Sequence, residues 1–109
     1  MDGFFQGQKR TYESFKVQVK PAMLPTFDSL REYCMALGNN VVEDVRAHRV
    51  VFGKSLSFRW FADLEPELED IVIKIQRDRK EPQRTVTVRN GDDLTEIKKL
   101  MQDAYNTIR

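Results

Sequence analysis

Five short segments between residues 41 and 89 constrain the fold more than any other feature of the sequence: two are rich in β-branched residues, and in three apolar and polar side chains alternate. Alternation with a period of two is typical of a β-strand that buries one face. Residues 41–54 are compatible with two strands or with one bent hairpin. The segments that we expect to be extended are 41–47, 49–54, 56–61, 71–76 and 85–89.

An earlier segment shows the same alternation. In residues 15–20, the apolar Phe15, Val17 and Val19 are separated by polar side chains. The pattern predicts a half-buried first strand, and Pro21 would end it because proline lacks the N–H group of a sheet hydrogen bond.

Two segments repeat apolar residues every three or four positions, the spacing of one helix face. In the first, Thr26 is the expected N-cap and Gly38 the expected end. Its apolar face holds Phe27, Leu30, Cys34 and Leu37. The second follows the turn at residues 90–91, and Asp93 with Glu96 three positions later has the capping-box pattern. Its apolar face holds Leu94, Ile97, Leu100, Met101, Ala104 and Ile108.

The order of these elements predicts an α+β fold, β-α-β-β-β-β(-β)-α. Because each element has one apolar face, we expect a two-layer sandwich with an antiparallel sheet and both helices on one face. Residues 11–109 would form this single domain, and residues 1–10 a flexible N-terminal arm. The expected core is Phe15, Val17, Leu30, Leu37, Val50, Phe52, Leu56, Phe58, Trp60, Ile71, Ile73, Ile75, Val86, Val88, Ile97 and Leu100.

Composition narrows the class of protein. The chain has 109 residues, with 18 Lys and Arg against 17 Asp and Glu, a formal net charge of +1. A nearly neutral chain has no overall attraction to nucleic acid or anionic lipid. No apolar run approaches the roughly 20 residues that span a bilayer, and the start of the chain lacks the pattern of a signal peptide. We expect a cytoplasmic protein that does not contact a membrane.

Candidate catalytic and metal-binding residues are few. Cys34 lies on the apolar face of the first helix and His48 in an expected turn, without the partners of a nucleophile or general base. The acidic residues of 63–70 lack the spacing of a calcium loop, and we expect a solvated loop there. We therefore expect no metal, no cofactor and a binding module rather than an enzyme. A small metal-dependent enzyme that uses this acidic loop ranks last.

The sheet face opposite the helices is the candidate binding site. Alternation places six basic side chains and no acidic one on it, together with Phe61. Basic side chains would contact phosphates, and the ring would stack on a nucleobase. The alternative is a solvated sheet, rich in Lys and Arg for solubility. The basic residues are Lys16, Lys20, Arg49, Arg59, Lys74 and Arg89.

These residues predict a module that binds DNA or RNA through its open sheet face. The alternative is a protein-interaction or self-association module, in which Val51, Phe61 and Val72 contact another protein or a second copy. The basic segment 77–84 would either clamp a phosphate backbone at the sheet edge or form a solvated hairpin loop.

Residues 27–66, FDSLREYCMALGNNVVEDVRAHRVVFGKSLSFRWFADLEP, resemble a family of uncharacterised prokaryotic domains of unknown function. The resemblance rests on a helix that ends at Leu37 and Gly38, a strand with acidic residues and valines, and the strand from Val50 to Lys54. It implies a two-layer sandwich similar to one half of the TATA-binding-protein fold, with no catalytic residue to transfer. Some relatives follow nuclease-like domains in longer chains, which points weakly to nucleic acid.

Overall fold

The computed structural model describes residues 10–57 and 59–108, and their fold is α+β with a five-stranded antiparallel sheet. The N-terminal arm expected at 1–10 lies almost wholly outside the described residues. The elements are α2 (Tyr12–Phe15), the 3₁₀ turn η1 (Lys16–Gln18), α3 (Leu24–Met35), β1 (Val41–Val45), β2 (Val50–Lys54), β3 (Trp60–Glu67), β4 (Asp70–Ile75), β5 (Arg84–Val88) and α4 (Thr95–Thr107).

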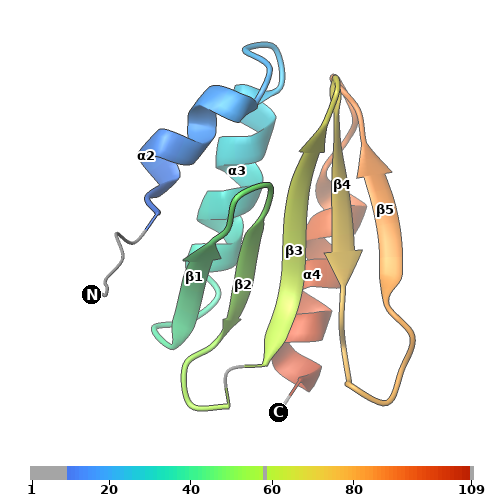
Figure 1. Ribbon diagram of the computed structural model, residues 1–109. Helices are drawn as coiled ribbons and strands as arrows, with labels where there is room; N and C mark the ends of the chain where they lie inside the picture. The colour runs from blue at the N-terminus through green and yellow to red at the C-terminus, as the bar shows by residue number, and fades with distance from the viewer. Residues whose placement is uncertain (1–9, 58, 109) are drawn as a thin grey trace.

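The sheet is a meander in which each strand pairs with the next along the chain, in the order β1-β2-β3-β4-β5 (Figure 1). All four pairings are antiparallel. The α+β class and the antiparallel sheet are confirmed. Residues 41–54 form two strands joined by a short turn, which resolves the alternative that the sequence left open.

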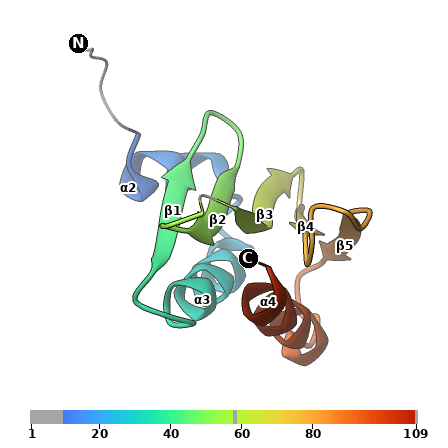
Figure 2. The same ribbon diagram turned by 90° about the horizontal axis from the view of Figure 1, so that it is seen from below.

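Helices α3 and α4 lie on the same side of the sheet (Figure 2). Helix α3 lies beside β1, where Arg31 pairs with Glu43, and α4 lies behind β3, where Tyr105 packs against Phe61. The core fills the space between the two layers. Its fully buried side chains include Phe27, Leu30, Cys34, Val50, Phe52, Phe61, Leu64, Ile71, Ile73 and Met101.

The expected strand at residues 15–20 is wrong, because this segment forms α2 and η1. Thr11 is the N-cap of α2, and its Oγ1 accepts a hydrogen bond from the backbone N–H of Ser14 at 3.2 Å. The segment has no partner strand in the sheet.

Burial explains why the alternation in this segment misled the prediction. Phe15 and Val19, four positions apart, are buried, and Phe15 packs on Phe27 with ring centroids 5.8 Å apart. Val17, expected in the core, is 85% exposed. Spacings of four residues fit a helical turn as well as a strand, so the buried pair alone does not distinguish them.

The sequence misplaced the N-cap of α3 by three residues and that of α4 by one. Helix α3 begins at Leu24, before the expected cap Thr26, because Pro25 is tolerated in the first turn. Helix α4 begins at Thr95, and the Asp93 carboxylate accepts hydrogen bonds from the Thr95 backbone N–H at 2.9 Å and hydroxyl at 2.7 Å. The N-cap residue is Leu94, without a side-chain cap, so the expected capping box at Asp93 and Glu96 is not formed.

The third strand differs most from the prediction. We expected a strand at 56–61 and a loop at 63–70, but residues 55–57 form a turn and β3 runs from Trp60 to Glu67. Leu56, expected in the core, is 98% exposed. Phe58, also expected there, lies outside the described residues.

A β-bulge in the pairing of β2 with β3 reverses the alternation at this point. Phe52 is opposite Ala62 and Gly53 is opposite Trp60, so Phe61 is an extra residue. Phe61 consequently points to the helices and is fully buried, with its ring edge-on to Tyr105 at 5.5 Å. Trp60, expected in the core, lines a hollow on the open face instead.

Candidate nucleic-acid interface

The open face of the sheet carries acidic as well as basic side chains. Strand register places Asp63 beside Val51 and Lys74, and Glu65 beside Val72, on the face opposite the helices. The prediction of a face without acidic residues is therefore wrong. It failed because the acidic segment expected to be a loop is strand β3, whose acidic side chains point to this face. The acidic side chains on it are Asp44, Asp63, Glu65, Glu67 and Asp70.

Arg49, a candidate phosphate contact, is paired within the sheet. Its guanidinium lies 3.4 Å from Asp63 Oδ2 and 3.2 Å from Glu65 Oε1. The Asp63 side chain is only 9% exposed, and its Oδ1 has no hydrogen-bond partner among the residues that the structure describes. Burial raises the pKa of Asp63, and attraction to Arg49 and Lys74 partly opposes the shift. Arg49 and Lys74 thus balance the acidic residues of β3.

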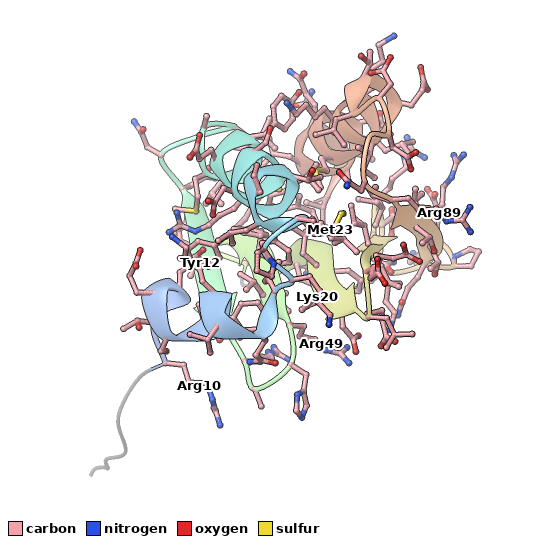
Figure 3. All side chains as sticks on the ribbon, turned by 90° about the horizontal axis from the view of Figure 1, so that it is seen from above. Arg10, Tyr12, Lys20, Met23, Arg49 and Arg89 are labelled. Carbon is pink, nitrogen blue, oxygen red and sulfur yellow. The ribbon has the colours of Figure 1, made fainter. Side chains whose placement is uncertain are left out.

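The remaining candidates are dispersed. Lys16 lies in η1, outside the sheet, 3.7 Å from Glu13. Figure 3 shows Arg89 well apart from Lys20 and Arg49. Phe61 cannot stack on a nucleobase because it is fully buried. The seven predicted site residues do not form one surface.

Arg59 lies at the other end of the sheet, where it borders a hollow of about 420 Å³. Three segments converge here: the β2–β3 loop, the β4–β5 hairpin and the end of α4 (Figure 1). A smaller adjoining hollow of about 210 Å³ is lined by Arg59, Asp78, Arg79 and Ile108. We call the two together the basic hollow. The larger part is lined by Arg59, Trp60, Gln76, Arg79, Glu81, Pro82, Gln83 and Ile108.

Hydrogen bonds hold the walls of the basic hollow in place. The buried Gln76 amide donates to the backbone carbonyls of Asp78 and of Glu81, the latter at 3.0 Å, which closes the β4–β5 hairpin. On the other wall, Lys54 Nζ donates to the carbonyl of Ile108 at 2.8 Å and lies 4.6 Å from the Tyr105 ring centroid. These contacts join the end of α4 to the sheet.

Two arginines of the basic hollow are available to a ligand. Among the described residues, neither Arg59 nor Arg79 has a carboxylate oxygen within 4.0 Å of its guanidinium. Glu81, an acidic residue of the wall, is held by Arg77, which lies 3.2 Å from Glu81 Oε1 and 2.5 Å from Asp103 Oδ2. The hollow therefore combines two guanidinium groups, an indole and amide side chains.

Sequence reasoning found part of this site. It named Arg59 and proposed the basic segment 77–84 as a phosphate clamp, and Arg79 lies in that segment. It missed Trp60, because period-two alternation without the bulge placed this residue in the core, and it did not select Gln76 as a site residue. The long hairpin with five basic residues in 74–84 was the available signal.

Two further features of the described residues concern reactive groups: the single cysteine and the grouping of possible metal ligands. Cys34 is fully buried on α3, as expected, and burial raises the pKa of its thiol to about 12. Within residues 10–57 and 59–108, no three His, Cys, Asp or Glu side chains are grouped so that they could hold a metal ion. None of the helices in the same residues is long and apolar enough to cross a lipid bilayer.

Comparison of the chain with protein-family models, with curated proteins and with solved structures gave no match. The resemblance to a family of uncharacterised prokaryotic domains thus stays a prediction.

Proposed function

We propose that the protein is a non-enzymatic module that binds single-stranded nucleic acid at the basic hollow rather than across the sheet face. The observation that carries this proposal is the pair Arg59 and Arg79, both free of carboxylate partners among the described residues and both beside Trp60. Guanidinium groups bind phosphate oxygens with charge-assisted hydrogen bonds. An indole stacks on any nucleobase, which makes binding tolerant of sequence.

The dimensions favour a single strand over a duplex. A volume of about 420 Å³ lies in the range of small-ligand pockets, roughly 300–1,000 Å³. It admits an unstacked base and its phosphate, whereas a duplex keeps its bases stacked inside. Lys80 and Arg84 are exposed on the same hairpin and extend the basic surface beyond the hollow.

The chain contains one tryptophan, so its fluorescence reports on the proposed site directly. Titration with oligothymidylate and oligouridylate of about eight nucleotides should quench Trp60 emission, and affinity should fall steeply with added salt. Arg59→Gln and Arg79→Gln should each weaken binding about tenfold, because each removes a charge-assisted contact.

The matched control is Arg89→Gln, an exposed arginine at the opposite end of the sheet. It should leave the affinity unchanged. The proposal fails if oligonucleotides leave Trp60 emission unchanged, or if Arg89→Gln weakens binding as much as Arg59→Gln does. Tighter binding of a duplex would assign the phosphate contacts to another surface.

One observation favours a second candidate, a protein-interaction surface on the open sheet face. Val42, Val51, Gly53 and Trp60 border a hollow of about 150 Å³ there, with Asp44 and Arg46 also in its lining. An apolar centre with a polar rim is typical of protein interfaces. Association through this face would be lost in Val42→Lys and would depend weakly on salt.

A further inference from the structure

The two ends of the β3–β4 hairpin carry opposite charge. The turn that joins the strands, which we call the acidic tip, comprises residues 67–70, three of which are acidic and none basic. It lies at the end of the sheet opposite the basic hollow (Figure 1). One copy of the chain therefore presents an acidic projection at one end and a basic recess at the other.

Leu68 makes the acidic tip unusual. Its side chain is 88% exposed, and its φ of 55° makes it the one non-glycine residue with positive φ in the described part of the chain. Glycine is the residue that such a turn position favours, since a Cβ is strained there. Neither burial within the chain nor turn geometry accounts for an apolar side chain at this point.

We infer that the basic hollow receives the acidic tip of a second copy of this chain. The hollow offers Trp60 and Pro82 as apolar contacts for Leu68. Two guanidinium groups of the hollow, from Arg59 and Arg79, have no carboxylate partner among residues 10–57 and 59–108, and they match the exposed carboxylates that flank the leucine at the tip. The tip and the hollow thus both combine apolar with charged groups, and the charges have opposite sign.

The carboxylates of the tip are available for this contact. Within the described residues, neither Glu67 nor Glu69 has a basic side-chain nitrogen within 4.0 Å. Figure 3 labels Lys20, Arg49 and Arg89 at this end of the molecule, and Lys20 borders a separate hollow with Glu69. Glu67, Leu68 and Glu69 are all exposed.

The geometry determines the kind of assembly. The tip and the hollow lie at opposite ends of the same strands, so a copy that inserts its tip into a neighbour still has its own hollow free. Such a heterologous contact produces head-to-tail chains or a closed ring instead of a two-fold dimer. A further consequence, which rests on the proposed function, is that an oligonucleotide and the acidic tip compete for the hollow.

Sedimentation velocity over micromolar to submillimolar protein concentrations tests the inference. The wild type should form oligomers that dissociate as salt rises, because the contact pairs exposed charges. Leu68→Gly removes the side chain and relieves the backbone, so it should be monomeric and at least as stable as the wild type. The double variant Arg59→Gln/Arg79→Gln should also be monomeric.

Mixing the two variants provides the sharpest arm of the experiment. The intact tip of the arginine variant should enter the intact hollow of Leu68→Gly, giving a one-to-one heterodimer that grows no further. A monomeric wild type, a Leu68→Gly variant that still associates, or a mixture without heterodimer would each overturn the inference. Loss of association in Val42→Lys alone would assign it to the open face instead.

The failure of this inference is distinguishable from failure of the proposed function. Leu68→Gly keeps the basic hollow and should bind oligothymidylate with wild-type affinity or better. If this variant binds oligonucleotide while the wild type never associates, the self-association is wrong and the nucleic-acid proposal stands. If the wild type associates as described but no oligonucleotide binds, the nucleic-acid proposal is wrong and the self-association stands.

Discussion

Arg31 illustrates how a single charged side chain connects three elements. Its Nε lies 2.5 Å from Glu43 Oε2 and its Nη2 lies 3.0 Å from Oε1, a bidentate pair between α3 and β1. The same guanidinium lies 4.2 Å from the ring centroid of Tyr12 on α2, and the Tyr12 hydroxyl donates to Asp28 at 2.5 Å. Helix α2 is too short to be stable without such contacts.

We expect Arg31→Ala to lower the free energy of unfolding by about 2 kcal/mol, because it leaves the half-buried Glu43 unpaired and removes the cation–π contact. Urea denaturation measures this loss. Arg46→Ala is the matched control: it breaks a more exposed pair with Asp44 and should cost at most about 0.5 kcal/mol. Equal losses in the two variants would contradict a structural role for Arg31.

The raised pKa of Asp63 makes the free energy of unfolding depend on pH. Burial raises its pKa above 3.8 in the folded state, so folding favours the protonated form. The stabilising contribution is complete at low pH and is lost as the pH rises through the raised pKa. Asp63→Asn resembles the protonated form at every pH, so its stability relative to the wild type should increase between about pH 3 and pH 7.

Asp93→Asn is a control of opposite sign. Hydrogen bonds from the Thr95 hydroxyl and N–H lower the pKa of Asp93, so its contribution appears as the pH rises. Urea denaturation across this pH range should therefore show Asp93→Asn losing stability relative to the wild type. If Asp63→Asn behaved in the same way, attraction to Arg49 and Lys74 would outweigh burial.

At the scale of elements, the bulge between β2 and β3 decides the site. Gly53 makes it feasible, because a Cβ at this position would lie 2.9 Å from the Arg59 carbonyl oxygen, a rigid backbone atom. The same irregularity places Trp60 on the open face and Phe61 in the core. The basic hollow depends on this local geometry.

Gly53→Ala should destabilise the protein by about 2 kcal/mol and change the emission of Trp60, because the backbone at Arg59 must move away. It should also weaken oligonucleotide binding. Gly91→Ala is the matched control: its φ of 88° costs about 1 kcal/mol, but nothing lies within 4 Å of the added Cβ. The Gly91→Ala variant should leave Trp60 emission and oligonucleotide binding unchanged. If the two variants changed Trp60 emission to a similar extent, the bulge would not be what positions the site.

Elements with strong local signals were predicted well. The helices at α3 and α4 and the strands β1, β2, β4 and β5 follow the periodicity of their side chains within a few residues. Segment 15–20 failed because its buried pair, Phe15 and Val19, is equally compatible with a helical turn. The prediction of strand β3 was wrong because the bulge changes which residues face the core, and the alternation of apolar and polar residues does not reveal a bulge.

At the scale of the whole molecule, the meander separates charge along the strand direction. The acidic residues of 63–70 belong to β3 and its turn, and the basic residues of 74–84 belong mainly to the next hairpin at the other end. A net charge of +1 conceals this separation. The proposed nucleic-acid site and the proposed head-to-tail contact both arise from it.

The sequence alone determined the α+β class, the antiparallel sheet, both main helices and the segregation of charge into two runs. These follow from the short-range periodicity and composition that adjacent residues carry. Only the tertiary structure decided the phase of β3, the exchange of Trp60 with Phe61, and the meeting of Arg59 with Arg79. The physical reason is that a bulge, and the meeting of two hairpin ends, depend on how one strand pairs with another. Period-two alternation indicates which face of a strand is buried, but it does not indicate the register of that strand with its neighbour.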